Sequence, residues 1–352
     1  MNSRKNISIL TLALLSSSAF AADFPHRREL NARSLAVGLG VSSVMPLVRT
    51  AGPGAPAVLE RFLSRWQQST TSITTAGDYE LTQDDTGLSA DNDRDGWSLK
   101  VSGDGTAVTY RNWAFHDAHS VPIDFAQRPP ESTLEAWGRR FLDGYLGTDV
   151  LVGPNEQRYP LSARYDTFSY QPTDLSAPAV DMVIGNVVVF TRAVNGVDVV
   201  GGGSKVAVFF ENDGTPYGFD FDWPNYVTPG GSMDVLSIDE INAQDALLSD
   251  YQFDASVAVD TRLFECGYFD AGIQFHDAQA LIQPGCAYQR TATFVGDPDL
   301  YAADPTDGLM QTGFVDVVPA ARLPQFDQFW PQVYYAFSGE HLRSAGDDPG
   351  QQ

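Results

Sequence analysis

The stretch from Asp181 to Trp223 constrains the fold more than any other part of this chain, because it has the pattern of consecutive strands joined by tight turns. Val187–Val194 is rich in β-branched residues and ends at Asn195-Gly196, a dipeptide that favours two-residue hairpins. A second turn signal, Asn212-Asp213-Gly214, follows a strand in which apolar residues alternate. The sequence therefore predicts a central antiparallel β-meander over residues 181–223 with one buried face.

The first 21 residues have the pattern of a secretory signal peptide. Arg4 and Lys5 supply basic charge, Ile7–Leu15 is a short apolar core, and Ala19-Phe20-Ala21 is a cleavage motif of the A-x-A type. No later apolar run reaches the roughly 18 residues that a membrane-spanning helix needs. We therefore expect an exported protein, secreted or periplasmic, whose mature part has no membrane span.

The charge of the chain argues against two classes of partner. The sequence has 45 acidic residues against 22 lysines and arginines, which gives a net charge of −23. Nucleic acids and anionic membranes bind basic surfaces, so we expect neither as a partner. The 352 residues are 43% hydrophobic, which is enough for a substantial core and for two domains.

Three segments have helical features. In Ala55–Ser69 the apolar residues recur at spacings of three and four, which predicts an amphipathic helix. Two further helices are expected after Ser132 and over Ser237–Leu248, because in each case the serine precedes a glutamate by three residues, as in a capping box. These helices alternate with strand-rich segments along the chain.

This alternation predicts an α+β fold in which helices pack on antiparallel, cystatin-like β-sheets in two joined subdomains. Proline and glycine cluster between residues 224 and 236, so we place the boundary there. The expected parts are a signal peptide (1–21), an N-terminal α+β subdomain that includes the meander (22–230), a C-terminal α+β subdomain (231–340) and a disordered tail (341–352).

Known enzyme signatures are missing from the sequence. Gly201-Gly202-Gly203-Ser204-Lys205 has neither the form of a nucleophile elbow nor that of a Walker loop, and we interpret it as a bend in a sheet. The zinc protease motif H-E-x-x-H is also missing. His116 and His119 have the spacing of a helical metal pair, but no third ligand is marked nearby, so a structural role is favoured.

The many carboxylates leave a hydrolase open as an alternative. In Asp220-Phe221-Asp222-Trp223 two acids alternate with aromatic residues, and on a strand the acids would share a face. Such a face is compatible with a sugar platform, but a solvated sheet face explains the pattern more simply. We therefore assign no catalytic residue and predict that the protein is not an enzyme.

The run Asp91-Asn92-Asp93-Arg94-Asp95-Gly96 matches the D-x-D-x-D-G opening of calcium-binding loops. We predict calcium as a cofactor, bound by side-chain oxygens of Asp91, Asp93 and Asp95 and by the backbone carbonyl of Trp97; a solvated acidic turn is the alternative. The twelfth loop position lacks the bidentate glutamate of an EF-hand, so another acid must complete the site. The nearest in sequence are Asp84, Asp85 and Asp104.

Cys266 and Cys286 are the two cysteines of the chain. In an exported protein this pair predicts an intramolecular disulfide. Gly272 and Pro284-Gly285 lie between them and allow the chain to fold back.

Arg192–Gly202, followed by an alternating strand and by Asn212-Asp213-Gly214, resembles the hairpin of the propeptide domains of thermolysin-type metalloproteases, the FTP/PepSY family. The predicted helix Ser237–Leu248 follows this hairpin region in the sequence, as a helix does in a PepSY-type unit. The resemblance covers residues 181–223. It implies a helix packed against an antiparallel sheet, and a secreted, non-catalytic domain that acts as a folding aid or an inhibitor of a peptidase.

We therefore expect a secreted, non-catalytic binding module, a free-standing propeptide-like inhibitor or folding aid, with an exported peptidase or another extracellular protein as partner. An exposed edge strand would accept an extended peptide from that partner. Two alternatives remain: a secreted carboxylate-dependent hydrolase, and a calcium-stabilised surface or adhesion protein.

Overall fold

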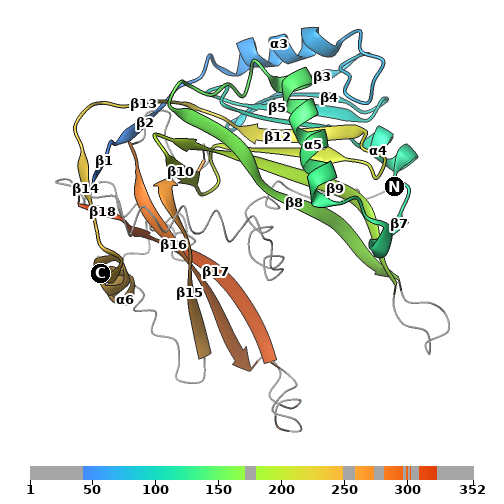
Figure 1. Cartoon of the computed structure of the whole chain (residues 1–352). Coiled ribbons are helices and arrows are strands. Elements are labelled where there is room, and N and C mark those ends of the chain that lie inside the picture. The colour runs from blue at the N-terminus through green and yellow to red at the C-terminus, as the bar shows by residue number, and fades with distance from the viewer. Residues whose placement is uncertain are drawn as a thin grey trace, which may run out of the picture. The chain divides into compact units, whose positions relative to one another are not determined.

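The computed structural model describes residues 43–170, 180–248, 258–272, 281–295 and 309–322, together with Asp299 and Ala302. The predicted signal peptide and the predicted tail lie outside these residues. The chain forms two compact units (Figure 1). The large unit consists of Val48–Val227 and Gly272–Ala280, and the small unit takes the remaining segments, including residues 43–47. Segments of the two units thus alternate along the chain, whereas two contiguous subdomains were expected.

An antiparallel sheet forms the base of the large unit. Its strands, ordered so that neighbours are hydrogen-bonded, are β10 (Val197–Val200), β9 (Val180–Val194), β11 (Lys205–Phe210), β12 (Pro216–Asp222), β6 (Ala107–Asn112), β5 (Trp97–Ser102), β4 (Gly87–Asn92) and β3 (Glu80–Asp84). β8 (Glu156–Tyr170) pairs with one side of β9, and β7 (Ile123–Asp124) pairs with the other side, on which β10 and β11 also lie. β2 (Leu47–Thr50) pairs with β13 (Asn225–Val227). The antiparallel strands expected over residues 181–223 are present as β9 to β12, but they do not form a simple meander, because β11 pairs with β9 and not with β10.

The hairpin turn between β9 and β10 has the predicted chemistry. Val194 lies opposite Val197, and the intervening Asn195 and Gly196 have φ angles of 53° and 79°. Two consecutive positive φ angles are characteristic of a type I′ turn, which asparagine and glycine tolerate at little steric cost. The local sequence is therefore sufficient to set this turn.

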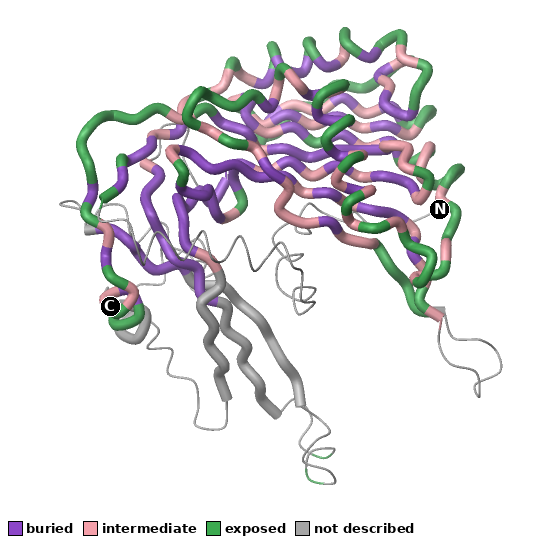
Figure 2. Tube along the Cα trace, in the orientation of Figure 1, coloured by how far each residue is buried: buried purple, intermediate pink, exposed green. Residues whose placement is uncertain are grey.

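Two helices pack on one face of the large sheet. α3 (Ala55–Trp66) and α5 (Glu131–Phe141) both reach Phe219 of β12, whose ring centroid lies 6.0 Å from that of Phe62 and 5.9 Å from that of Phe141. All three rings are buried, and burial of such a side chain contributes about 1.5–3 kcal/mol. The buried residues follow the middle of the sheet (Figure 2).

The ends of the helices only partly match the sequence patterns. The buried face predicted for Ala55–Ser69 is confirmed, although α3 ends at Trp66. The capping box expected at Ser132 is wrong, because α5 begins at Glu131 with Pro130 in the N-cap position and no side-chain cap. A short π-helical turn, η2 (Leu142–Leu146), continues α5. α4 (Trp113–His119) and the turn η1 (Phe125–Gln127) complete the large unit.

The small unit has its own sheets and its own core. β15 (Ala258–Phe269), β16 (Leu281–Val295) and β17 (Leu309–Pro319) pair antiparallel, and β1 (Ser43–Val44), β14 (Met233–Val235) and β18 (Ala321–Arg322) form a second sheet. The helix of this unit is α6 (Ile238–Leu248). Its predicted capping box is confirmed: the backbone N–H of Ser237 donates to Oε2 of Glu240 (2.9 Å), and that of Glu240 donates to Oγ of Ser237 (3.3 Å).

The predicted fold class is wrong. Strands dominate the described chain, and its few helices do not form the helix layer of a cystatin-like sheet. Three segments with helical patterns led to the expectation of a helix layer, whereas strands such as β3, whose five residues are all exposed, have no hydrophobic alternation that would mark them in the sequence. Among the described helices, none has the length and apolar character required to cross a membrane.

Candidate functional site

β3 forms one edge of the large sheet, and β8, which pairs only with β9 among the described strands, forms another. β3 pairs with β4 on one side, and no strand among the described residues pairs with its other side. All five of its residues are exposed. Since an edge strand presents unpaired backbone N–H and C=O groups, β3 is able to accept a further strand.

An apolar groove of about 370 Å³ lies beside this edge. Six apolar residues line it together with four polar ones: Pro56, Leu59, Leu63, Tyr79, Leu81 and Leu88, and Glu60, Ser64, Gln67 and Thr75. Leu81 is 61% exposed and Tyr79 is 41% exposed, which leaves much apolar surface in contact with solvent. Apolar surface that gathers at one place is a frequent feature of interaction sites.

The same edge is acidic. Asp78, Glu80, Asp84 and Asp85 fall within eight residues, without a lysine or arginine among them. Hydrogen bonds from the hydroxyl and backbone N–H of Thr86 lower the pKa of Asp84 to about 2, with a further contribution from Lys100. Asp84 therefore stays charged at neutral pH. The edge thus combines free backbone groups, an apolar groove and negative charge.

The structure places the three predicted calcium ligands at the end of β4 and in the turn that follows. Oδ2 of Asp91 accepts a hydrogen bond from Ser89 (2.9 Å), and Oδ2 of Asp95 accepts one from Asn92 (3.0 Å). Asp93 is exposed. Within the described ranges, no three His, Cys, Asp or Glu side chains are gathered as metal ligands. Calcium binding, including the role of the Trp97 carbonyl, stays a prediction.

His116 and His119 bond to different groups. Nδ1 of His116 lies 2.8 Å from Oε1 of Glu211, and its ring stacks on that of Tyr217 at a centroid distance of 4.4 Å. His119 instead bonds to the carbonyl of Phe115 and stacks on its ring. The two histidines therefore do not converge in the manner of a metal pair. No sequence motif marks Glu211, so its contact with His116 was not predicted.

The acids of the Asp220–Trp223 run each bind an arginine. Asp220 forms a two-point ion pair with Arg111 (2.8 and 2.5 Å), and Asp222 binds Arg49. The alternation on β12 does place both acids on one face, but each of them balances a cation. This arrangement stabilises the sheet and does not provide two carboxylates that act on a shared substrate.

The glycine loop Gly201–Gly203 connects β10 to β11, as expected of a bend in a sheet. Ser204, which ends the loop, is buried and has a φ of 53°. Its Oγ accepts a hydrogen bond from Nε of Arg192 (3.1 Å) and lies 2.6 Å from the hydroxyl of Tyr226. Ser204 is thus held in place by neighbouring side chains.

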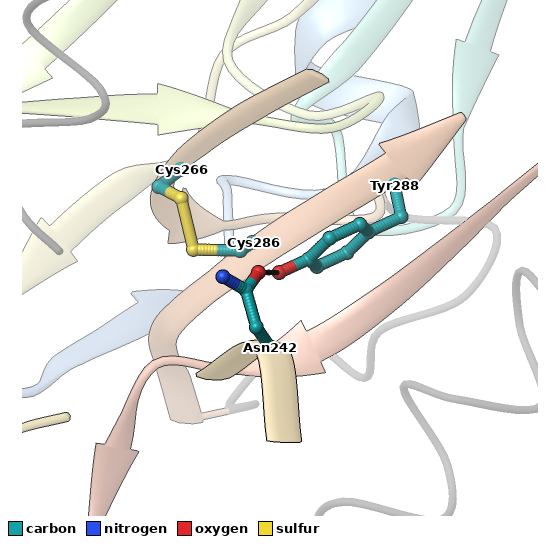
Figure 3. Close-up of a disulfide and its surroundings, with 4 residues drawn as sticks. All are labelled: Asn242, Cys266, Cys286 and Tyr288. Atoms are coloured by element: carbon teal, nitrogen blue, oxygen red, sulfur yellow. Dashed lines mark hydrogen bonds between the residues drawn. A yellow bond between two sulfur atoms is a disulfide. The ribbon is translucent and has the colours of Figure 1, made fainter. Parts of the chain in front are cut away.

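The predicted disulfide is present in the small unit (Figure 3). Cys266 of β15 lies directly opposite Cys286 of β16, and both are fully buried. Nearby, the hydroxyl of Tyr288 donates a hydrogen bond to Oδ1 of Asn242 on α6 (2.7 Å). The disulfide therefore joins the neighbouring strands β15 and β16 close to the place where α6 contacts β16 through Tyr288.

Comparisons with known proteins add little. No family model matches the chain, and no curated protein matches it. Among solved structures, the chain is similar to an uncharacterized protein from Eubacterium rectale ATCC 33656, with 12% sequence identity, a TM-score of 0.48, and coverage of 80% of this chain and 87% of that chain. A likeness at this score carries no argument about function, so the similarity to the FTP/PepSY family stays a prediction.

Proposed function

We propose that this protein is a secreted, non-catalytic binding module that holds an extended segment of a partner protein as an added strand on β3. The observation that carries the proposal is the open edge of β3 beside the apolar groove. An added strand would gain main-chain hydrogen bonds, each with a net contribution of about 0.5–1.5 kcal/mol. Its alternate side chains would enter the groove next to Leu81 and Tyr79.

Other features of the chain support the details of this proposal. An exported peptidase is the partner that the FTP/PepSY resemblance suggests. A secreted or periplasmic location agrees with the Cys266–Cys286 disulfide, because disulfides persist in oxidising compartments. Asp220 and Asp222, which the hydrolase alternative would use, are both engaged with arginines.

The proposal is tested by screening the mature protein against an array of extended peptides and by following backbone amide exchange on binding. We expect a bound peptide to slow exchange of the amides in residues 80–84, because an added strand covers them. Substrate turnover that is lost on substitution of one Asp or Glu would overturn the proposal, as would protection confined to another part of the sheet.

Matched variants make the test specific to the groove. Leu81→Asn removes an apolar side chain that is 61% exposed at the groove, and Leu151→Asn removes one that is 63% exposed outside it. We expect Leu81→Asn to weaken peptide binding about tenfold, which corresponds to the loss of one partly buried apolar contact. Leu151→Asn should bind as the wild type does.

A further inference from the structure

The two faces of β3 differ in chemistry. In the pairing with β4, Leu81 lies opposite Ala90, which is fully buried under α3, and Leu81 lines the groove. Glu80 lies opposite Asp91 and therefore belongs to the other face. Because side chains of an added strand alternate with the same period of two, its residues would meet the apolar face and the acidic face in turn.

The acidic face has an unbalanced charge pair. Glu80 and Asp91 are directly opposite each other, and like charges in that position destabilise a sheet. Neither of the two forms an ion pair with another described residue, whereas Asp84 is 3.2 Å from Nζ of Lys100. A cation placed on the open side of β3 next to Glu80 would reduce this repulsion.

The wider charge distribution favours the same kind of partner. Residues 78–85 carry four acids and no lysine or arginine, within a chain whose net charge is −23. Opposite charge on two partners speeds their association, while like charge disfavours wrong partners. An acidic edge strand would therefore repel an acidic segment and attract a basic one.

We propose that the partner segment is basic and alternating, with lysine or arginine on the face that meets Glu80 and Asp84 and apolar residues on the face that enters the groove beside α3. This inference rests on the proposed function of β3 as the acceptor of an added strand. The alternation specifies the partner more narrowly than charge alone does. A basic segment whose lysines and arginines do not alternate with apolar residues would place some of these charged side chains in the mainly apolar groove.

Three short peptides test the pattern: one alternates lysine with valine, one alternates serine with valine, and one has the lysine–valine composition arranged in two blocks. Each is titrated into the mature protein by fluorescence anisotropy, and protection of residues 80–84 is followed by amide exchange. At low salt we expect the alternating lysine peptide to bind about tenfold or more tightly than the other two. This preference should shrink at about 0.15 M salt, where the Debye length is about 8 Å.

A matched pair of variants separates a local effect from net charge. Glu80→Gln and Asp117→Asn each remove one negative charge, but Asp117 is exposed on α4 and belongs neither to β3 nor to the lining of the groove. We expect Glu80→Gln to weaken binding of the alternating lysine peptide about two- to fivefold, as for a cross-strand charge pair, and Asp117→Asn to leave it unchanged.

The two proposals fail in different ways. If all three peptides bind equally well and protect residues 80–84, the basic alternating pattern is wrong and the acceptor role of β3 stands. If Glu80→Gln has no more effect than Asp117→Asn, the inference is also overturned. If the peptides that bind leave the exchange of residues 80–84 unchanged, the proposed function fails and the inference fails with it.

Discussion

At the residue scale, Glu211 combines deep burial with one strong contact. Its side chain is 2% exposed, and Oε1 lies 2.8 Å from Nδ1 of His116. Oε2 has no hydrogen-bond partner among the described residues. Burial raises the pKa of Glu211, and the hydrogen bond to His116 partly opposes that rise. The folded state therefore holds a proton on Glu211 more readily than the unfolded chain does.

This raised pKa gives a pH-dependent prediction. The stability that the group contributes is fully present below its ordinary pKa of 4.5 and is lost as the pH rises through the folded pKa. Glutamine keeps the shape and cannot ionise, so we expect Glu211→Gln to gain free energy of unfolding relative to wild type as the pH rises from about 4 to about 7. Denaturant titrations at several pH values measure this difference; a difference that does not vary with pH would contradict it.

Gly138 provides a second test at this scale. A Cβ at this position of α5 would lie 2.6 Å from the buried ring of Phe190 on β9, so the helix packs closely only because the side chain is absent. We expect Gly138→Ala to destabilise the large unit by about 1–3 kcal/mol through overpacking. Gly144, in η2, has open space around its Cβ position, so Gly144→Ala should be neutral or stabilising by up to about 1 kcal/mol. Equal effects in thermal unfolding would refute the explanation.

At the element scale, the Cys266–Cys286 bond ties β15 to β16 where the two strands are already in register. Mass spectrometry of the unreduced protein should find no free thiol. The cysteines are 20 residues apart, so we expect the double variant Cys266→Ala/Cys286→Ala to lose about 3 kcal/mol of stability, mainly because its unfolded chain is less restricted. Two free thiols in the wild-type protein would show that the bond does not form.

At the scale of the whole molecule, each unit has its own hydrophobic core. One core gathers α3, α5 and the strands of the large unit around Phe219, and the other gathers Ile241, Tyr288 and Val318 around the disulfide. Separate cores favour separate cooperative transitions. We therefore expect calorimetry to resolve two transitions.

The variants above assign these transitions to the units. Gly138→Ala should lower only the transition of the large unit, and the double cysteine variant only that of the small unit. A single transition that both variants shift equally would mean that the chain unfolds as one cooperative block.

The sequence by itself determined the features that depend on neighbouring residues. The buried face of α3, the Asn195-Gly196 hairpin and the Ser237–Glu240 capping box follow from local periodicity, backbone preferences and hydrogen bonds within a few residues. The disulfide was predictable because the chain has two cysteines, so one pairing is possible.

Only the tertiary structure decided the fold class and the candidate site. The contacts of Glu211 with His116 and of Arg111 with Asp220 join residues 95 and 109 positions apart. β3 has one apolar residue, Leu81, among four polar ones, and all five are exposed, so its place in the sheet does not follow from its own residues. Whether a strand lies at an edge depends on which other strands pair beside it, and that is set by burial over the whole sheet.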